Sequence, residues 1–178
     1  RGFVVQRFST ADIYESIELR GLLEGMAARL AAERLDDPAE AAELQAVNKQ
    51  LVILVRRRKL TLECLEQYMD LNAKFHAEIL RLSQCRMLHR AMEHICSLPF
   101  ASPSAFVRRQ YIAPESWELF HIAIDQHGGI LDAILNREAA RAETLSREHA
   151  RVARRNLESA LKNGEIAKFV PGMKLIKL

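Results

Sequence analysis

Three histidines occupy positions where a helix that faces a protein core normally carries Leu or Ile. His76, His127 and His149 each belong to a series of residues three or four apart, which is the spacing of one helix face. A buried imidazole must find hydrogen-bond partners or a metal ion. Three of them on three helices predict a polar site inside a helical bundle. The three series are Leu65, Met69, Asn72, His76, Ile79, Ser83; then Trp117, Phe120, Ile124, His127, Leu131, Ile134; and Ala142, Leu145, His149, Val152.

The composition is that of a globular helical protein. Of 178 residues, 49% are hydrophobic and 28% charged, and only seven are Gly and five Pro, which favours helix. A charged residue interrupts every apolar stretch, so no membrane span is expected. The net charge of +3 is too small to indicate nucleic-acid binding. Cys64, Cys85 and Cys96 form no C-x-x-C pair, which predicts reduced thiols and a cytoplasmic location.

The pattern along the chain predicts an all-α antiparallel bundle of about six to seven helices. Residues 1–8 read as a short strand, residues 9–164 as one helical domain, and residues 165–178 as a tail without helical period. Ser9 or Thr10 is expected to cap the first helix, and Asp37 with Pro38 to open the second. The expected helices cover about 10–35, 38–58, 61–82, 86–97, 114–136 and 137–163, with a loop at 99–104 and a short helical turn at 106–111.

Four motifs in order resemble one known family. The segments are Glu18-Leu19-Arg20-Gly21-Leu22-Leu23-Glu24 for E-x-R-x-x-L-E, Phe75-His76 for D-x-x-F-H, Gln126-His127 with Ile130 and Ala133-Ile134 for H-x-x-I-x-x-A-I, and Arg147-Glu148-His149 for R-x-H. They resemble motifs of the FCD domain, the effector domain of GntR-type transcriptional regulators of the FadR subfamily. The resemblance covers roughly residues 10–160.

The resemblance implies a homodimeric regulator that responds to a small organic acid. The family carries an N-terminal winged helix-turn-helix that binds a DNA operator, and residues 1–5 resemble the last strand of its wing. The chain is therefore expected to be the effector-binding part of such a protein, acting as a repressor that its metabolite releases. The segment 170–176 resembles vanillate-type regulators, which implies an aromatic acid.

The resemblance also implies a metal site. In metal-binding members of the family an Asp and three His hold a divalent transition metal, and the matching positions are Asn72, His76, His127 and His149. Zn²⁺ or Ni²⁺ is the expected ion. Asn72 departs from the pattern, because its oxygen carries no charge; weaker metal binding and stronger attraction for an anion are expected. The alternative is that the metal has been lost and the histidines bind a ligand directly or pair with one another.

Arg20 interrupts the apolar face of the first helix. It could bind an effector carboxylate through its forked N–H groups, or pair with Glu24 one turn later. The other candidates for the effector pocket could equally be core or surface residues: Tyr68, His94, Trp117 and His121. Gly128 and Gly129 follow His127 and could leave room for a ligand or allow close helix packing.

Two other functions compete with regulation. A metal held by three His could activate water in an enzyme, but the sequence has no H-E-x-x-H, a single Glu-x-x-His at 118–121 and no G-x-S-x-G. A purely structural helical module would not explain three His on core faces. The sequence therefore favours a regulator and not an enzyme.

Overall fold

The structure, a computed structural model, describes residues 8–56, 61–98, 101–104, 116–162 and 176–177. It confirms the expected all-α bundle. The described residues form six α-helices, a 3-10 turn and two strands of two residues each. The helices are α1 (Thr10–Arg34), α2 (Ala42–Val55), α3 (Leu62–Leu82), α4 (Arg86–Ser97), α6 (Ser116–Leu135) and α7 (Ala139–Lys162); η1 (Pro38–Ala41) precedes α2, and β1 (Phe8–Ser9) pairs in parallel with β2 (Ile176–Lys177).

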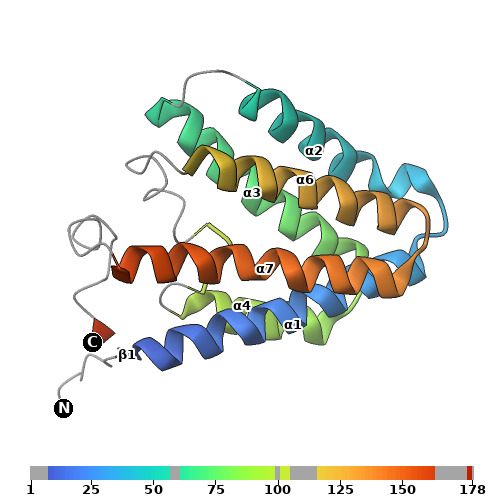
Figure 1. Ribbon diagram of the computed structural model, residues 1–178. Helices are drawn as coiled ribbons and strands as arrows, with labels where there is room; N and C mark the ends of the chain where they lie inside the picture. Colours follow the sequence, from blue (N-terminus) through green and yellow to red (C-terminus); the bar gives the residue numbers. More distant parts are fainter. Residues whose placement is uncertain (1–7, 57–60, 99–100, 105–115, 163–175, 178) are drawn as a thin grey trace, which may run out of the picture.

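The helices run back and forth along the bundle, so that α6 and α7 lie side by side in opposite directions (Figure 1). Helix α1 is central: it packs most extensively against α7 and also contacts α3, α4 and α6, whereas α2 covers α3 and α6. The apolar faces of these helices meet in one core around the fully buried Phe75, Phe120 and Ile130. Each of the three expected histidine faces is therefore turned toward the inside of the bundle.

The helix starts follow the capping signals in the sequence. Ser9 caps α1 through a reciprocal pair of bonds with Asp12, and the carboxylate of Asp37 accepts a hydrogen bond from the Ala39 amide. One difference is local: Pro38 opens a 3-10 turn and not the first turn of α2, which is a common way for a helix to begin.

Parts of the expected organisation fall outside the described residues. These are the first seven residues of the expected strand, the helical turn at 106–111, and the tail segment 170–175. In the part of the chain that the structure describes, no helix is both long enough and apolar enough to cross a membrane.

Two glycines let α1 approach α7 closely. A Cβ atom on Gly21 would lie 2.9 Å from the Cβ of Ala150, and one on Gly25 would lie 2.5 Å from Cγ of Arg147. Gly128 in α6 differs, because a Cβ there meets no atom within 4 Å. Helix α6 continues through Gly128 and Gly129 without interruption. Helix α6 is therefore unbroken at Gly128, and a side chain there would meet open space.

The difference in space around Gly21 and Gly128 predicts opposite effects of a Gly→Ala substitution at the two positions. Gly→Ala in a helix interior contributes about 1 kcal/mol of helix propensity, so Gly128→Ala is expected to raise the free energy of unfolding by about that amount. Gly21→Ala should lose this gain, because the new methyl overlaps a methyl on a neighbouring helix, and such overpacking costs about 1–3 kcal/mol. Urea denaturation of both variants measures the difference; equal stabilisation would show that α1 and α7 can move apart freely.

Candidate metal centre and effector pocket

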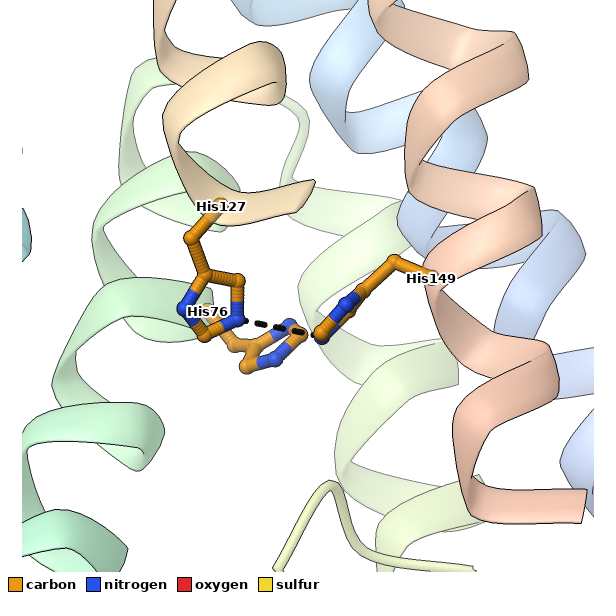
Figure 2. Close-up of side chains that lie close together, drawn as sticks. All are labelled: His76, His127 and His149. Atoms are coloured by element: carbon orange, nitrogen blue, oxygen red, sulfur yellow. Dashed lines mark hydrogen bonds between the residues drawn. The ribbon is translucent and has the colours of Figure 1, made fainter. Parts of the chain in front are cut away.

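Three helices bring His76, His127 and His149 together inside the bundle (Figure 2). His76 comes from α3, His127 from α6 and His149 from α7. The Nε2 atoms of His127 and His149 are 3.0 Å apart, and one nitrogen from each of the three rings lies within 4.8 Å of the others. His127 is completely buried and His149 is 8% exposed. The sequence prediction that these faces converge agrees with this geometry.

Polar partners on the outer side of two rings fix which nitrogen faces inward. Nδ1 of His149 lies 3.1 Å from Oε1 of Gln126, and Nδ1 of His76 lies 3.1 Å from Oε1 of Glu24. An oxygen acceptor at Nδ1 selects the tautomer with the proton there and leaves a lone pair on Nε2. Among the described residues, Nε2 of His76 and Nδ1 of His127 are buried without a hydrogen-bond partner.

Burial keeps the two innermost rings neutral. It lowers the pKa of His149 from its ordinary 6.5 to about 3, helped by the neighbouring His76. It also lowers the pKa of His127 well below 6.5, with further contributions from His149 and His76. Neutral imidazoles are the form that binds metal ions, so at neutral pH no proton has to leave these two rings first.

The arrangement fits a transition-metal ion. Zn²⁺ binds imidazole nitrogen at roughly 2.0–2.1 Å in tetrahedral geometry, which places ligand atoms roughly 3.4 Å apart. The observed separations, 3.0 Å for one pair and up to 4.8 Å within the group, lie on both sides of that value. An ion would also satisfy the lone pair of His76 that has no partner. Phe75 stacks on His127 with ring centroids 4.1 Å apart and forms an apolar wall.

Asn72 lies one turn before His76 and is buried, but its amide is engaged elsewhere. Its Nδ2 donates a hydrogen bond of 3.1 Å to Oγ of Ser104. The Ser104 hydroxyl in turn lies 3.5 Å from the carbonyl oxygen of Met69. The contact ties residues 101–104 to α3, and the role of Asn72 as a fourth metal ligand stays a prediction.

Arg20 is buried and pairs with Glu24, as one of the two predictions for it expected; its role in binding an effector stays a prediction. Its side chain is 3% exposed, and its Nε lies 3.7 Å from Oε2 of Glu24, which is a loose ion pair within α1. Nε and Nη1 have no hydrogen-bond partner in the described part of the chain. A buried guanidinium with free N–H donors is suited to bind a carboxylate.

Glu24 is ionised despite its burial. Burial by itself would raise its pKa, but the positive charge of Arg20 and the contact with His76 outweigh it and lower the pKa from 4.5 to about 2. The carboxylate therefore stands between the guanidinium and one of the three histidines.

The remaining candidates for the effector pocket differ in burial. Tyr68 is buried and makes an edge-to-face contact with Phe120, with centroids 4.6 Å apart; burial raises the pKa of its hydroxyl. His94 and His121 are exposed on α4 and α6. Trp117 belongs to α6, but its side chain lies outside the described part of the structure. The roles of all four in effector binding stay predictions.

Sequence reasoning missed two residues of the site. Gln126 and Glu24 contact the outer nitrogens of His149 and His76. Gln126 stands directly before His127 in a matched motif, but nothing local shows that it reaches α7. Glu24 was recognised as a partner for Arg20, four residues away, and its contact with His76 depends on the packing of α1 against α3.

Comparison with known proteins identifies the family of the domain. Residues 15–152 match the family model described as the FCD domain. The chain is 28% identical over 157 residues to the Glc operon transcriptional activator of Escherichia coli strain K12, an alignment that covers 86% of this chain and 59% of the relative. The protein of the same description from Escherichia coli O6:H1 matches equally. The chain thus spans 59% of the length of these curated relatives.

Proposed function

Because this chain belongs to the FCD domain family, we propose that it is the effector-sensing domain of a DNA-binding transcriptional regulator. The observation that carries the proposal is the buried site, where three histidines converge close to an arginine with unused donors, and two of the histidines have a nitrogen without a partner among the described residues. Polar nitrogens are costly to bury without partners, so we expect a bound ligand to supply the missing partners. The curated relatives are named as transcriptional activators, which supports a regulatory role.

In this proposal His76, His127 and His149 hold a divalent transition metal, with Zn²⁺ or Ni²⁺ as the first candidates. The ion supplies positive charge and Lewis acidity toward an anionic oxygen. Arg20 binds a carboxylate of a small organic acid, for which an aromatic acid is one candidate class. The acid need only favour one arrangement of the regulator by about 1–3 kcal/mol to alter its affinity for DNA.

The metal is tested by elemental analysis of the purified domain, prepared without added metal or chelator. About one Zn or Ni per chain, or tight uptake of added Zn²⁺, is the expected result. A domain that takes up neither ion would contradict the metal site. Direct binding of a carboxylate by the three histidines would then be the function to test.

Arg20→Met is expected to weaken binding of small carboxylates by about 10- to 100-fold, because a charged hydrogen bond contributes about 1.5–3 kcal/mol. Titration calorimetry with a panel of aliphatic and aromatic carboxylates measures the change. Arg29→Met is the matched control, since Arg29 lies on the same helix but is 36% exposed and pairs with Glu33. Equal losses in both variants, or none in Arg20→Met, would contradict the role of Arg20.

We also propose that the regulator is a homodimer and that α1 contributes to its interface. Leu19, Leu22 and Met26 share one face of α1 and are 50%, 47% and 38% exposed. A row of large apolar side chains open to water is typical of an interaction surface, and a two-fold axis would pair this face with itself.

Leu22→Glu is expected to shift the domain from dimer to monomer, because it places a charge in the middle of the apolar row. Sedimentation equilibrium at micromolar concentrations measures the shift. Leu62→Glu is the control, since Leu62 is 56% exposed on α3, away from the row. A wild-type domain that is monomeric throughout this range would contradict the interface.

The proposed regulator belongs to the FadR subfamily of GntR-type proteins and acts in the cytoplasm as a repressor that the acid releases from its operator. A winged helix-turn-helix joined to this domain would bind the DNA. A transcription reporter driven by the full regulator, measured with and without a bound carboxylate, tests the direction: expression that falls when the acid is added would show an activator or co-repressor response instead.

A further inference from the structure

We propose that Glu24 is the positioning residue of the metal centre: its carboxylate orients the His76 imidazole so that Nε2 faces the ion, and it brings a negative charge to a centre in which position 72 is a neutral Asn. This inference rests on the proposed function, because it requires the three histidines to bind a metal. It assigns to Glu24 a role beyond that of a partner for Arg20.

The geometry places Glu24 on the outer side of a metal ligand. Glu24 belongs to α1 and is 4% exposed, and its Oε1 lies 3.1 Å from Nδ1 of His76 on α3. The contact is an ion pair by distance, and the Glu24 oxygens make no aligned hydrogen bond among the described residues. A small rotation of either side chain would let the carboxylate accept the outer N–H of His76, which fixes the ring tautomer and makes the inner nitrogen more basic. The nitrogen left free by this contact, Nε2 of His76, is buried and has no hydrogen-bond partner among the described residues.

The same arrangement occurs at a second histidine. Oε1 of Gln126 lies 3.1 Å from Nδ1 of His149, whose Nε2 lies 3.0 Å from Nε2 of His127. Two rings from different helices are thus held by an oxygen behind them and present Nε2 forward. Glu24 differs from Gln126 in one respect that matters for a cation, namely its charge.

The negative charge of Glu24 matters because the proposed ligands do not neutralise the ion. Three neutral imidazoles leave a divalent ion with its full +2 charge, and the amide of Asn72 adds none and donates to Ser104. Glu24 is a carboxylate in direct contact with one of the ligands. Glu24 is 4% exposed and lies about one turn after Gly21, where α1 approaches α7 closely.

The competing explanation is that Glu24 serves only to neutralise the buried Arg20. The two side chains are one helix turn apart, with 3.7 Å between Nε and Oε2. Removing Glu24 alone cannot separate the two roles, because it would also leave Arg20 buried without a counter-charge, which is strongly destabilising. The comparison is therefore made where Arg20 is already absent, a background in which Glu24 keeps His76 and the bound ion as its partners.

The test compares Arg20→Met with the double variant Arg20→Met/Glu24→Met. Zn²⁺ affinity is measured by competition with a chromophoric chelator, and the coordination geometry by the visible absorption of bound Co²⁺. The double variant is expected to bind Zn²⁺ roughly 10- to 100-fold more weakly than Arg20→Met, with an altered Co²⁺ spectrum. Adding Glu33→Met to Arg20→Met, which removes an exposed carboxylate from the same helix, should change neither readout.

Equal Zn²⁺ affinity and equal Co²⁺ spectra in the two proteins would overturn the proposal for Glu24 and leave the metal site intact. Absence of Zn²⁺ and Co²⁺ binding in the wild-type domain would overturn the metal site itself, and the role of Glu24 with it. A second measurement needs no variant and therefore does not depend on whether a variant folds. Two-bond ¹H–¹⁵N correlations of the metal-free wild-type domain should show His76 protonated at Nδ1. Protonation at Nε2 would overturn the proposal.

Discussion

Replacing His149 by Ala is expected to abolish metal retention by this domain. The substitution removes one of three nitrogens that lie within 4.8 Å of one another, and no other His, Cys, Asp or Glu in the described part of the chain joins that group. Loss of an outer hydrogen-bond partner already costs roughly 10- to 100-fold in metal affinity, so loss of a ligand should cost more. Elemental analysis and Zn²⁺ competition measure the change.

The variant should remain folded. The substitution His149→Ala leaves a small gap and removes the hydrogen-bond partner of Gln126. Such losses lower the free energy of unfolding by about 1–3 kcal/mol. Circular dichroism checks the helix content. Added Zn²⁺ at 1,000 times its dissociation constant should stabilise the wild-type domain by about 4 kcal/mol and leave the variant unchanged. His94→Ala, at an exposed histidine on α4, should bind Zn²⁺ like the wild type. Full metal occupancy of His149→Ala would assign the ion to other residues.

The metal-free domain is expected to lose about 4 kcal/mol of stability between pH 7 and pH 5. His127 and His149 have pKa values well below 6.5 in the folded protein, and that of His149 is about 3. In the unfolded chain both titrate near 6.5, so below that pH the unfolded state binds more protons and stability falls as pH falls. Each histidine contributes about 2 kcal/mol over this interval.

Urea denaturation in the presence of a chelator measures this dependence at several pH values. The pKa of Glu24 is lowered to about 2, so its own stabilising contribution is lost mainly below pH 4.5 and lies outside the window. His149→Gln should halve the loss between pH 7 and pH 5, whereas His94→Gln should leave it unchanged. Stability that is constant across this interval would mean that both rings take up protons in the folded state, and would contradict their burial as neutral groups.

The predictions for metal retention and for pH dependence rest on the same property of the site: its polar groups are buried in the ligand-free protein. His76, His127 and Arg20 all have nitrogens without a partner among the described residues. Apolar side chains at these positions would need no hydrogen-bond partner in the core. Their retention is explained if binding of a metal and an acid supplies the missing partners.

The helices and their inward faces could be predicted from the local sequence. Helix ends depend on residues a few positions apart, such as Ser9 with Asp12 and Asp37 with Ala39, and these local contacts can be predicted from spacing. The faces follow from the 3.6-residue period, which placed His76, His127 and His149 on the buried side of three helices. The periodicity of side chains along one helix does not depend on what the helix packs against.

Which atoms of these residues meet depends on how the helices pack against one another. Asn72 was expected to offer its oxygen to the site because it lies one turn before His76, and that role stays a prediction; what the spacing could not show is that its Nδ2 donates to Ser104, 32 residues away. Glu24 was predicted to pair with Arg20 on its own helix, and the packing of α1 against α3 places it against His76 as well. Spacing along a helix fixes the direction of a side chain but not its neighbours, since those come from other helices whose distance and rotation are set by the fit of the whole core.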